Sequence, residues 1–257
     1  MGRCEDTGLN EVYLDKKYIR NAENSSKGTQ LKFFKDNIWY KQNRSGYEGR
    51  AEVLCSLLLS YTNITDYVVY EECRINGRSG CRSQSFLRPE EECITLQRLY
   101  EFHMGGQFYD AIMKYAKVEE RIAYTLEFVW KATGIDLREY LGRLLTFDMV
   151  TLNIDRHFHN ICVIRQADGS YRQAPIFDNG AALLSNFGLF PMDEDLETNI
   201  GRAVAAPFSG SFELQAKALG MELAVRPAVL EALKRYPDCR AKQVLLYQLR
   251  RYDFLIV

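Results

Sequence analysis

The chain has 257 residues, of which 47% are hydrophobic and 26% are charged, so it can bury a sizeable core as one large domain or as a two-lobed one. Its formal net charge of −1 provides no general attraction to nucleic acid or to an anionic membrane. It has seven cysteines but no Cys-x-x-Cys pair, and no apolar signal region at its start, so we expect a reduced, cytoplasmic protein.

The first third of the sequence is expected to be rich in β-strands. Short apolar or aromatic stretches between turn-forming residues predict strands at residues 10–14, 30–34, 37–42 and 66–71. Leucines at helical spacing predict a helix at residues 50–60. A polar loop with one glycine, residues 22–29, precedes the second strand, and residues 81–87 are expected to form a surface loop that links two lobes.

After about residue 90 the pattern becomes helical. Apolar periodicity predicts helices at residues 92–102, 118–133 and 136–151, and again over much of the chain after about residue 212. Between them, Asp168-Gly169 predicts a hairpin turn that joins strands at residues 161–165 and 170–175. We therefore expect an α+β, bilobal fold, with a small β-rich lobe at residues 1–90 and a larger helical lobe at residues 91–257.

The stretch NIDRHFHN, residues 153–160, carries the strongest chemical signal. Asp155 and Asn160 lie in a loop between a helix and the hairpin, and Asp178 follows the hairpin directly. Because a hairpin brings its two ends together, Asn160 and Asp178 should offer oxygen ligands to one hard cation, and Mg²⁺ suits so sparse a ligand set. Asp155 would then be free to meet an incoming hydroxyl group. This order of base, metal-binding asparagine and metal-binding aspartate is typical of phosphoryl transfer by protein kinases.

The first lobe supplies the other parts that phosphoryl transfer needs. Lys41 lies near the end of a predicted strand, where a kinase holds the lysine that pairs with the phosphates, and Lys32 is its rival for that role. Glu52 on the following helix is the expected ion-pair partner of Lys41, with Glu48 one turn earlier as the alternative.

The sequence resembles the HipA-like serine/threonine kinases. The loop SSKGTQLK fits the Ser-x-x-Gly-x-Gln-x-Lys pattern of that family, through Ser25, Gly28, Gln30 and Lys32. NIDRHFHN is similar to its Asp-Arg-His-x-x-Asn catalytic loop, and APIFDNG is similar to its downstream metal-binding segment. The resemblance covers roughly residues 25–180. Only 24 residues precede the loop, so we expect a minimal version without the N-terminal subdomain that contacts antitoxins, or with that subdomain on another chain.

The resemblance implies a protein-kinase-like fold, with ATP and Mg²⁺ as cofactors. Asp155 would be the catalytic aspartate, supported by His157, while Asn160 and Asp178 would be the magnesium ligands and Lys41 the ATP lysine. Fold analogy places the adenine near Tyr70.

The resemblance also implies partners and regulation. The substrate would be a protein with a serine or threonine hydroxyl group, and an antitoxin-type regulator is a further implied partner, without direct binding of nucleic acid or membrane. Ser25 matches the loop serine that such kinases phosphorylate in themselves, with Ser26 and Thr29 as competing sites. The sequence does not name the substrate, the oligomeric state or membership of a toxin–antitoxin system.

Three other functions use some of the same residues. A phosphoinositide or small-molecule kinase would apply this machinery to another hydroxyl group. A pseudokinase would keep the fold as a binding module, although such a module needs none of the catalytic residues. A metal-dependent hydrolase could be built on Asp155, His157 and His159, but the sequence supplies no convincing further ligand.

Overall fold

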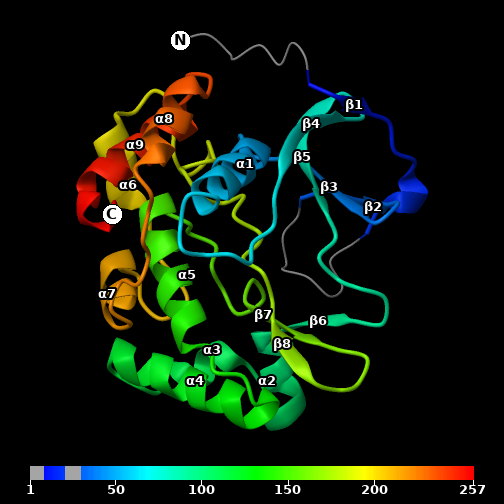
Figure 1. Cartoon of the computed structure of the whole chain (residues 1–257), viewed down its shortest axis with the longest axis vertical. Coiled ribbons are helices and arrows are strands. Elements are labelled where there is room, and N and C mark those ends of the chain that lie inside the picture. The colour runs from blue at the N-terminus through cyan, green and yellow to red at the C-terminus, as the bar shows by residue number, and fades with distance from the viewer. Residues whose placement is uncertain (1–8, 21–29) are drawn as a thin grey trace.

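The computed structural model describes residues 9–20 and 30–257 (Figure 1). Within these residues, a sheet in the order β1-β4-β5-β3-β2 forms the small lobe, and its pairs are antiparallel except that of β1 with β4. The strands are β1 (Glu11–Val12), β2 (Lys32–Lys35), β3 (Ile38–Gln42), β4 (Glu71–Ile75) and β5 (Arg78–Gln84). A single-turn helix, η1 (Lys16–Tyr18), lies between β1 and the next described strand.

Two tight turns set the register of this sheet. Asp36 and Asn37 have φ of 52° and 62° between β2 and β3, and Asn76 and Gly77 have φ of 48° and 78° between β4 and β5. Positive φ at both central residues is typical of type I′ turns, whose twist matches that of the strands. The β4–β5 hairpin was not predicted, although the Asn-Gly pair at 76–77 is a typical hairpin signal.

Helix α1 (Glu48–Leu59) packs against β4 and β5 and confirms the predicted helix in this region. Its approach is close because glycines face each other: a Cβ on Gly49 would lie 2.6 Å from the carbonyl carbon of Gly80. Gly80 in turn lies against β3, where its own Cβ would be 2.1 Å from the carbonyl oxygen of Lys41. This close packing fixes α1 relative to the strand that carries Lys41.

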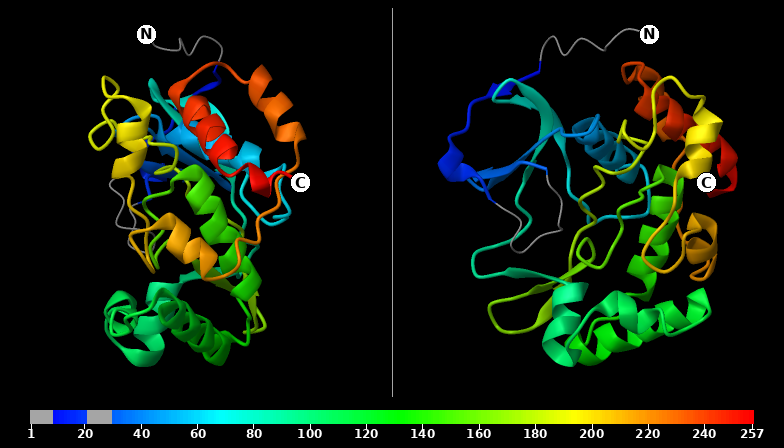
Figure 2. Two further views of the ribbon diagram at one scale, coloured as in Figure 1. Left: turned by 90° about the vertical axis from the view of Figure 1, so that its left-hand side faces the viewer. Right: turned by 180° about the vertical axis from the view of Figure 1, so that it is seen from behind.

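The larger lobe combines helices with a sheet in the order β6-β7-β8, formed by β6 (Glu92–Thr95), β7 (Cys162–Arg165) and β8 (Tyr171–Gln173). The helices are α2 (Leu96–Met104), α3 (Phe108–Ile112), α4 (Val118–Thr133), α5 (Arg138–Thr151), α6 (Leu196–Arg202), α7 (Phe212–Lys217), α8 (Ala228–Arg235) and α9 (Arg240–Arg251), followed by the single turn η2 (Asp253–Leu255). Helix α5 runs through the middle of this lobe, between the α2–α4 group and the C-terminal helices (Figure 2). No helix within the described ranges is long and apolar enough to cross a membrane.

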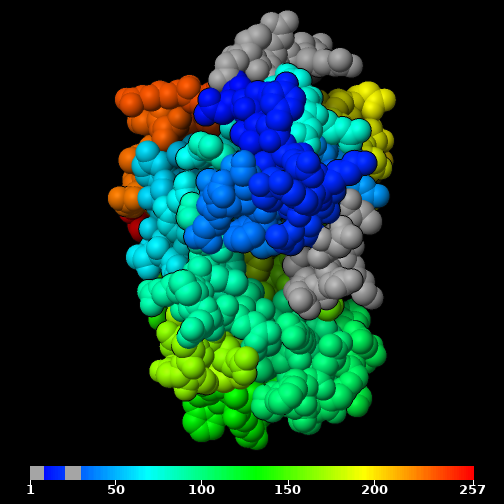
Figure 3. Space-filling model, turned by 90° about the vertical axis from the view of Figure 1, so that its right-hand side faces the viewer, coloured from blue at the N-terminus to red at the C-terminus, as the bar shows by residue number. Residues whose placement is uncertain are grey.

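Residues 85–91 connect β5 of the small lobe to β6 of the large one, on the side seen in Figure 3. Arg172 of β8 holds this connection: its Nε and Nη2 lie 3.0 Å and 2.7 Å from the carboxylate oxygens of Glu91, and Nη2 also donates to the carbonyl of Phe86 at 3.3 Å. The connection is thus hydrogen-bonded to the larger lobe at both ends.

Several predicted elements agree with the structure. The helix expected at 118–133 is α4, and Gly134 ends it in the left-handed conformation with φ of 76°. The hairpin around Asp168-Gly169 is the β7–β8 pair, in which Val163 is opposite Gln173. The expected α+β class is therefore confirmed.

Three predicted elements were right only in part; the helix expected at 92–102, for one, begins at Leu96 as α2. In residues 66–71 only Glu71 belongs to a strand; residues 66–70 instead run beside Ile176, whose carbonyl accepts from Val68 N at 2.9 Å. Residues 81–84 belong to β5, so only residues 85–87 of the predicted linking loop lie in the connection. Residues 92–95 are not helical but form strand β6, which pairs with β7 at residues 162–165. Local periodicity cannot reveal a strand that depends on a partner so distant in the sequence.

Candidate active site

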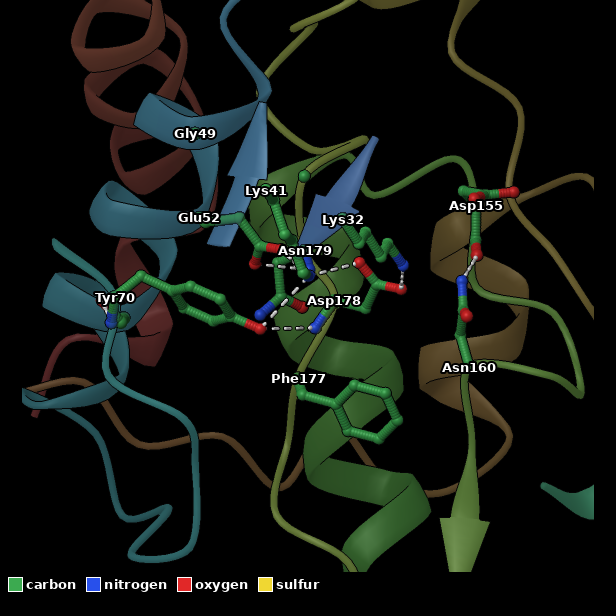
Figure 4. Close-up of polar contacts among 12 residues, drawn as sticks. Lys32, Lys41, Gly49, Glu52, Tyr70, Asp155, Asn160, Phe177, Asp178 and Asn179 are labelled. Atoms are coloured by element: carbon green, nitrogen blue, oxygen red, sulfur yellow. Dashed lines mark hydrogen bonds and ion pairs between the residues drawn. The ribbon is translucent and has the colours of Figure 1, made fainter. Parts of the chain in front are cut away.

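Asp178 lies between two lysines on neighbouring strands (Figure 4). Lys32 of β2 and Lys41 of β3 are directly opposite in the antiparallel register. Asp178 Oδ1 is 2.7 Å from Lys41 Nζ, and its Oδ2 is 3.6 Å from Lys32 Nζ. Burial alone would raise the pKa of Asp178, but the two ammonium groups outweigh it and hold the pKa well below its usual range. The carboxylate therefore stays ionised and offsets the repulsion between the lysines.

A second carboxylate, Glu52, ties α1 to the same lysine. Glu52 is 1% exposed, and its Oε1 lies 2.6 Å from Lys41 Nζ while its Oε2 accepts the backbone N–H of Asn179 at 2.7 Å. Burial lowers the pKa of Lys41, but Asp178 and then Glu52 more than compensate, so the pKa lies well above its usual value. The expected Lys41–Glu52 ion pair is thus present, and it joins β3, α1 and the segment around Asp178.

The backbone at Asp178 is left-handed, with φ of 59°. Its N–H donates to the hydroxyl of Tyr70 at 3.3 Å, and that hydroxyl lies 3.4 Å from Lys41 Nζ. Asp and Asn tolerate this conformation better than other residues that have a side chain. Tyr70, near which fold analogy placed the adenine, therefore contributes its side-chain hydroxyl to the site.

Asn160 presents an acceptor that lacks a partner. Its Nδ2 donates to the carbonyl of Asp155 at 2.8 Å, which fixes the direction of the amide (Figure 4). The side chain is buried, and its Oδ1 has no hydrogen-bond partner among the described residues. A buried unsatisfied acceptor is unfavourable unless something binds it. This atom suits a cation.

Asp148, a buried acid on α5 that was not predicted as a site residue, holds Arg156. Arg156 is 1% exposed, and its Nε and Nη2 donate to the two carboxylate oxygens of Asp148 at 2.9 Å and 3.0 Å. The same guanidinium donates from Nη1 to the carbonyls of Asn160 at 3.3 Å and Phe177 at 3.0 Å, and from Nη2 to Asn179 Oδ1 at 2.6 Å. One buried ion pair thus brings the loop at 153–160 to the segment around Asp178. The only signal for it was one acid among the otherwise uncharged residues 144–151, the second half of α5.

Asp155 differs from the other acids of the site because its side chain is 55% exposed. Partial burial raises its pKa above the usual aspartate value, and His157 counteracts this, with Nε2 at 3.5 Å from Oδ1. An accessible carboxylate with a raised pKa can accept a proton from a hydroxyl group.

A pocket of about 160 Å³ opens at Asp155. It is lined by residues of both lobes: Gln30, Lys32, Arg44, Ser45, Glu48, Asp155, Asp178, Gly180, Ala181, Ser185 and Asn186. The pocket therefore joins the accessible carboxylate to the two strands and to the chain that follows Asp178.

The other residues named from the sequence either lie outside the described part of the chain or make contacts that differ from those expected. Ser25 and Gly28 lie outside the described residues. Glu48, the alternative partner for Lys41, instead accepts backbone N–H groups of residues 44–46. The rings of His157 and His159 are 5.5 Å apart, but residues 9–20 and 30–257 contain no group of three or more His, Cys, Asp or Glu arranged to hold a metal ion. The hydrolase alternative therefore gains no third ligand from this part of the chain.

The residues fit a magnesium ion bound together with phosphates. Asn160 Oδ1 is an unused acceptor, and Asp178 is a carboxylate held ionised. Mg²⁺ is usually held by one or two such oxygens, with phosphate oxygens completing its shell.

No protein-family model and no curated protein matches this sequence. Solved structures do match its fold. The crystal structure of the Helicobacter pylori proinflammatory kinase CtkA aligns with a TM-score of 0.59 and 12% identity, over 96% of this chain and 95% of that one. HipA from Shewanella oneidensis MR-1, in a toxin–antitoxin complex with HipB and operator DNA, aligns with a TM-score of 0.48 and 13% identity, over 94% of this chain and 67% of that one. The bilobal, kinase-like α+β fold expected from the sequence is therefore confirmed by its similarity to the kinase CtkA along almost the whole chain.

Proposed function

We propose that this protein is a serine/threonine protein kinase of the HipA-like type, which transfers the γ-phosphoryl group of ATP in a Mg²⁺-dependent reaction. The observation that carries the proposal is the convergence of Lys41, Asp178, Asn160 and Asp155 from both lobes on one site. Phosphoryl transfer needs little covalent help from a protein, and charges held in place supply most of the catalysis.

Each residue has a distinct part in the proposed reaction. Asn160 and Asp178 would hold Mg²⁺, which neutralises phosphate charge. Lys41, kept in position by Glu52, pairs with the phosphates, and Lys32 adds a second positive charge beside them. Asp155 accepts the hydrogen bond of the incoming hydroxyl group and orients it, since its carboxylate is accessible. Arg156 keeps the two loops together.

The finer assignments from the motif resemblance are part of the same proposal. Ser25, Gly28 and Gln30 would belong to the loop that covers the phosphates, with autophosphorylation at Ser25, and Tyr70 would line the nucleotide site. A division into lobes near residue 90, a cytoplasmic location and an antitoxin-type regulator complete it.

The test is mass spectrometry of the purified protein before and after incubation with ATP and Mg²⁺. We expect added phosphate on Ser25, Ser26 or Thr29, or on a generic protein substrate, that is absent from Asp155→Asn and Asp178→Asn. Asp193→Asn is the matched control, because Asp193 is an exposed aspartate outside the site.

Each other outcome points to a named alternative. Transfer only to a lipid or a small molecule would replace the protein substrate. Binding of ATP without transfer to any acceptor would indicate a pseudokinase. Undiminished transfer in either site variant would refute the assigned roles.

A further inference from the structure

Arg44 stands at the mouth of the pocket that holds Asp155, in the connection between β3 and α1. It is exposed and lines the pocket together with Lys32 and Asp155. No carboxylate of the described residues forms an ion pair with its guanidinium group. Lys41, in contrast, is buried between two acids. Arg44 is therefore a cation in the same pocket as the accessible carboxylate of Asp155, and no acid in residues 9–20 and 30–257 compensates its charge.

Glu48, the acid that contacts the backbone at Arg44, is already occupied. Its Oε1 accepts the N–H of Ser45 at 2.7 Å, and its Oε2 accepts the N–H groups of Arg44 and Gly46, both at 3.2 Å. Three backbone donors that converge on one carboxylate stabilise its charge without a side-chain partner. They also fix the backbone of the loop from which the Arg44 side chain projects.

We infer that Arg44 determines substrate specificity by binding an aspartate or glutamate that lies close to the phosphoacceptor hydroxyl in the substrate protein; this rests on the proposed kinase function. The acceptor must reach Asp155, and Arg44 lines the same 160 Å³ pocket. An extended peptide advances about 3.3–3.6 Å per residue, so the acid lies within about three positions of the acceptor. A guanidinium group suits this ligand, because it can bind a carboxylate through two parallel hydrogen bonds.

The competing ligand for Arg44 is the terminal phosphate of ATP. The two cases differ in the kinetic constant that changes. A contact with the substrate affects the kcat/KM of acidic peptides and leaves the KM for ATP unchanged, whereas a phosphate contact raises the KM for ATP and weakens all peptides equally.

The experiment uses synthetic peptides with one serine in a neutral background and an aspartate placed in turn at each of the three positions on either side. We expect wild-type protein to prefer the best acidic peptide over its neutral parent by about tenfold in kcat/KM, the effect of one charge-assisted contact. In Arg44→Ala this ratio should fall to near one. In Arg44→Glu, lysine at the same position should become the better choice. Arg78→Ala is the matched control, because Arg78 is an exposed arginine at the start of β5 and does not line the pocket; it should keep the wild-type ratio.

The outcomes separate the two proposals. Transfer without an acidic preference, or a preference that survives in Arg44→Ala, would overturn the role of Arg44 and leave the kinase function intact. A raised KM for ATP in Arg44→Ala would assign the residue to the nucleotide. Absence of transfer to any peptide or to the protein itself would overturn the kinase function, and the inference with it.

Discussion

The raised pKa of Asp155 should determine how activity depends on pH. In the proposed reaction this carboxylate acts in its ionised form, so activity should fall as the pH drops through its pKa. Because partial burial raises that pKa, the acidic limb should lie above the value of about 3.9 that an unperturbed aspartate would give. In His157→Ala the limb should move to still higher pH, since His157 lowers the pKa of Asp155. The measurement is kcat against pH for both proteins at saturating ATP; coincident limbs would contradict the contribution of His157.

Removal of the Asp148 carboxylate should cause a large loss of stability. Asp148→Ala leaves the Arg156 guanidinium buried without its ion-pair partner, which should lower the free energy of unfolding by about 3–5 kcal/mol. Glu127→Ala removes an exposed helix pair with Lys131 and should change it by no more than about 0.5 kcal/mol. Urea unfolding of the two variants measures both values. Equal losses would show that the buried pair does not hold the fold.

Site residues could be predicted from the sequence where their spacing along the chain indicates a shared role. Residues whose role depends on an ion pair formed only in the folded protein could not. Asp155, Asn160 and Asp178 were proposed because a loop and a hairpin bring them together. Asp148 was missed because its importance depends on an arginine eight positions later, which folds back from the end of α5. The one local signal, an acid among otherwise uncharged residues of α5, does not say what the acid binds.

At the scale of elements, the close contact of α1 with β5 leaves no room for a side chain at Gly49. Alanine normally favours a helix over glycine by about 1 kcal/mol. At Gly49, however, the added Cβ would lie 2.6 Å from Gly80, so the helix must shift and carry Glu52 away from Lys41. We expect Gly49→Ala to lower both the rate of phosphoryl transfer and the thermal midpoint. Gly201→Ala in α6 is the control, because outside its own helix no heavy atom of the described part of the chain lies within 4 Å of its added Cβ. If both variants behave like wild type, the close approach is not needed.

Helices and strands were predicted well where the local sequence, through its apolar period and its end signals, determines their bounds. Helix α4 was located at both ends because its apolar period is clear and Gly134 stops it. Strand β6 was taken for the start of a helix, since it is a strand only through its pairing with β7. The strand expected at 66–71 was mostly wrong for a related reason. Residues 66–70 form a single isolated bridge, between Tyr67 and Ile176, and are not part of a described sheet.

At the scale of the whole molecule, Tyr236 connects the C-terminal helices to the small lobe. It follows α8, and its hydroxyl donates to Glu72 Oε1 at 2.6 Å, while Glu72 Oε2 lies 3.0 Å from Arg50 Nη2 on α1. Tyr236→Phe removes a hydrogen bond to a charged group, which should lower the free energy of unfolding by about 1.5–3 kcal/mol. It should also reduce transfer, because α1 carries Glu52.

Tyr109→Phe provides the comparison, since Tyr109 is a half-exposed tyrosine on α3. Urea midpoints and transfer rates of the two variants are measured side by side. Equal midpoints would show that this contact between the lobes does not stabilise the molecule. The sequence predicted two lobes from the change in periodicity near residue 90, but contacts of this kind join residues more than 160 positions apart and leave no local signal.

The left-handed backbone at Asp178 has an evolutionary consequence. Among residues with a side chain, aspartate and asparagine accept this conformation most readily, and glycine also accepts it. A change to glutamate would keep the charge but add strain to the chain and displace the carboxylate from Lys41 and Lys32, so the longer acid should be disfavoured at this position. A descendant that loses the charge should do so through asparagine or glycine, and would then keep its shape after its chemistry is gone.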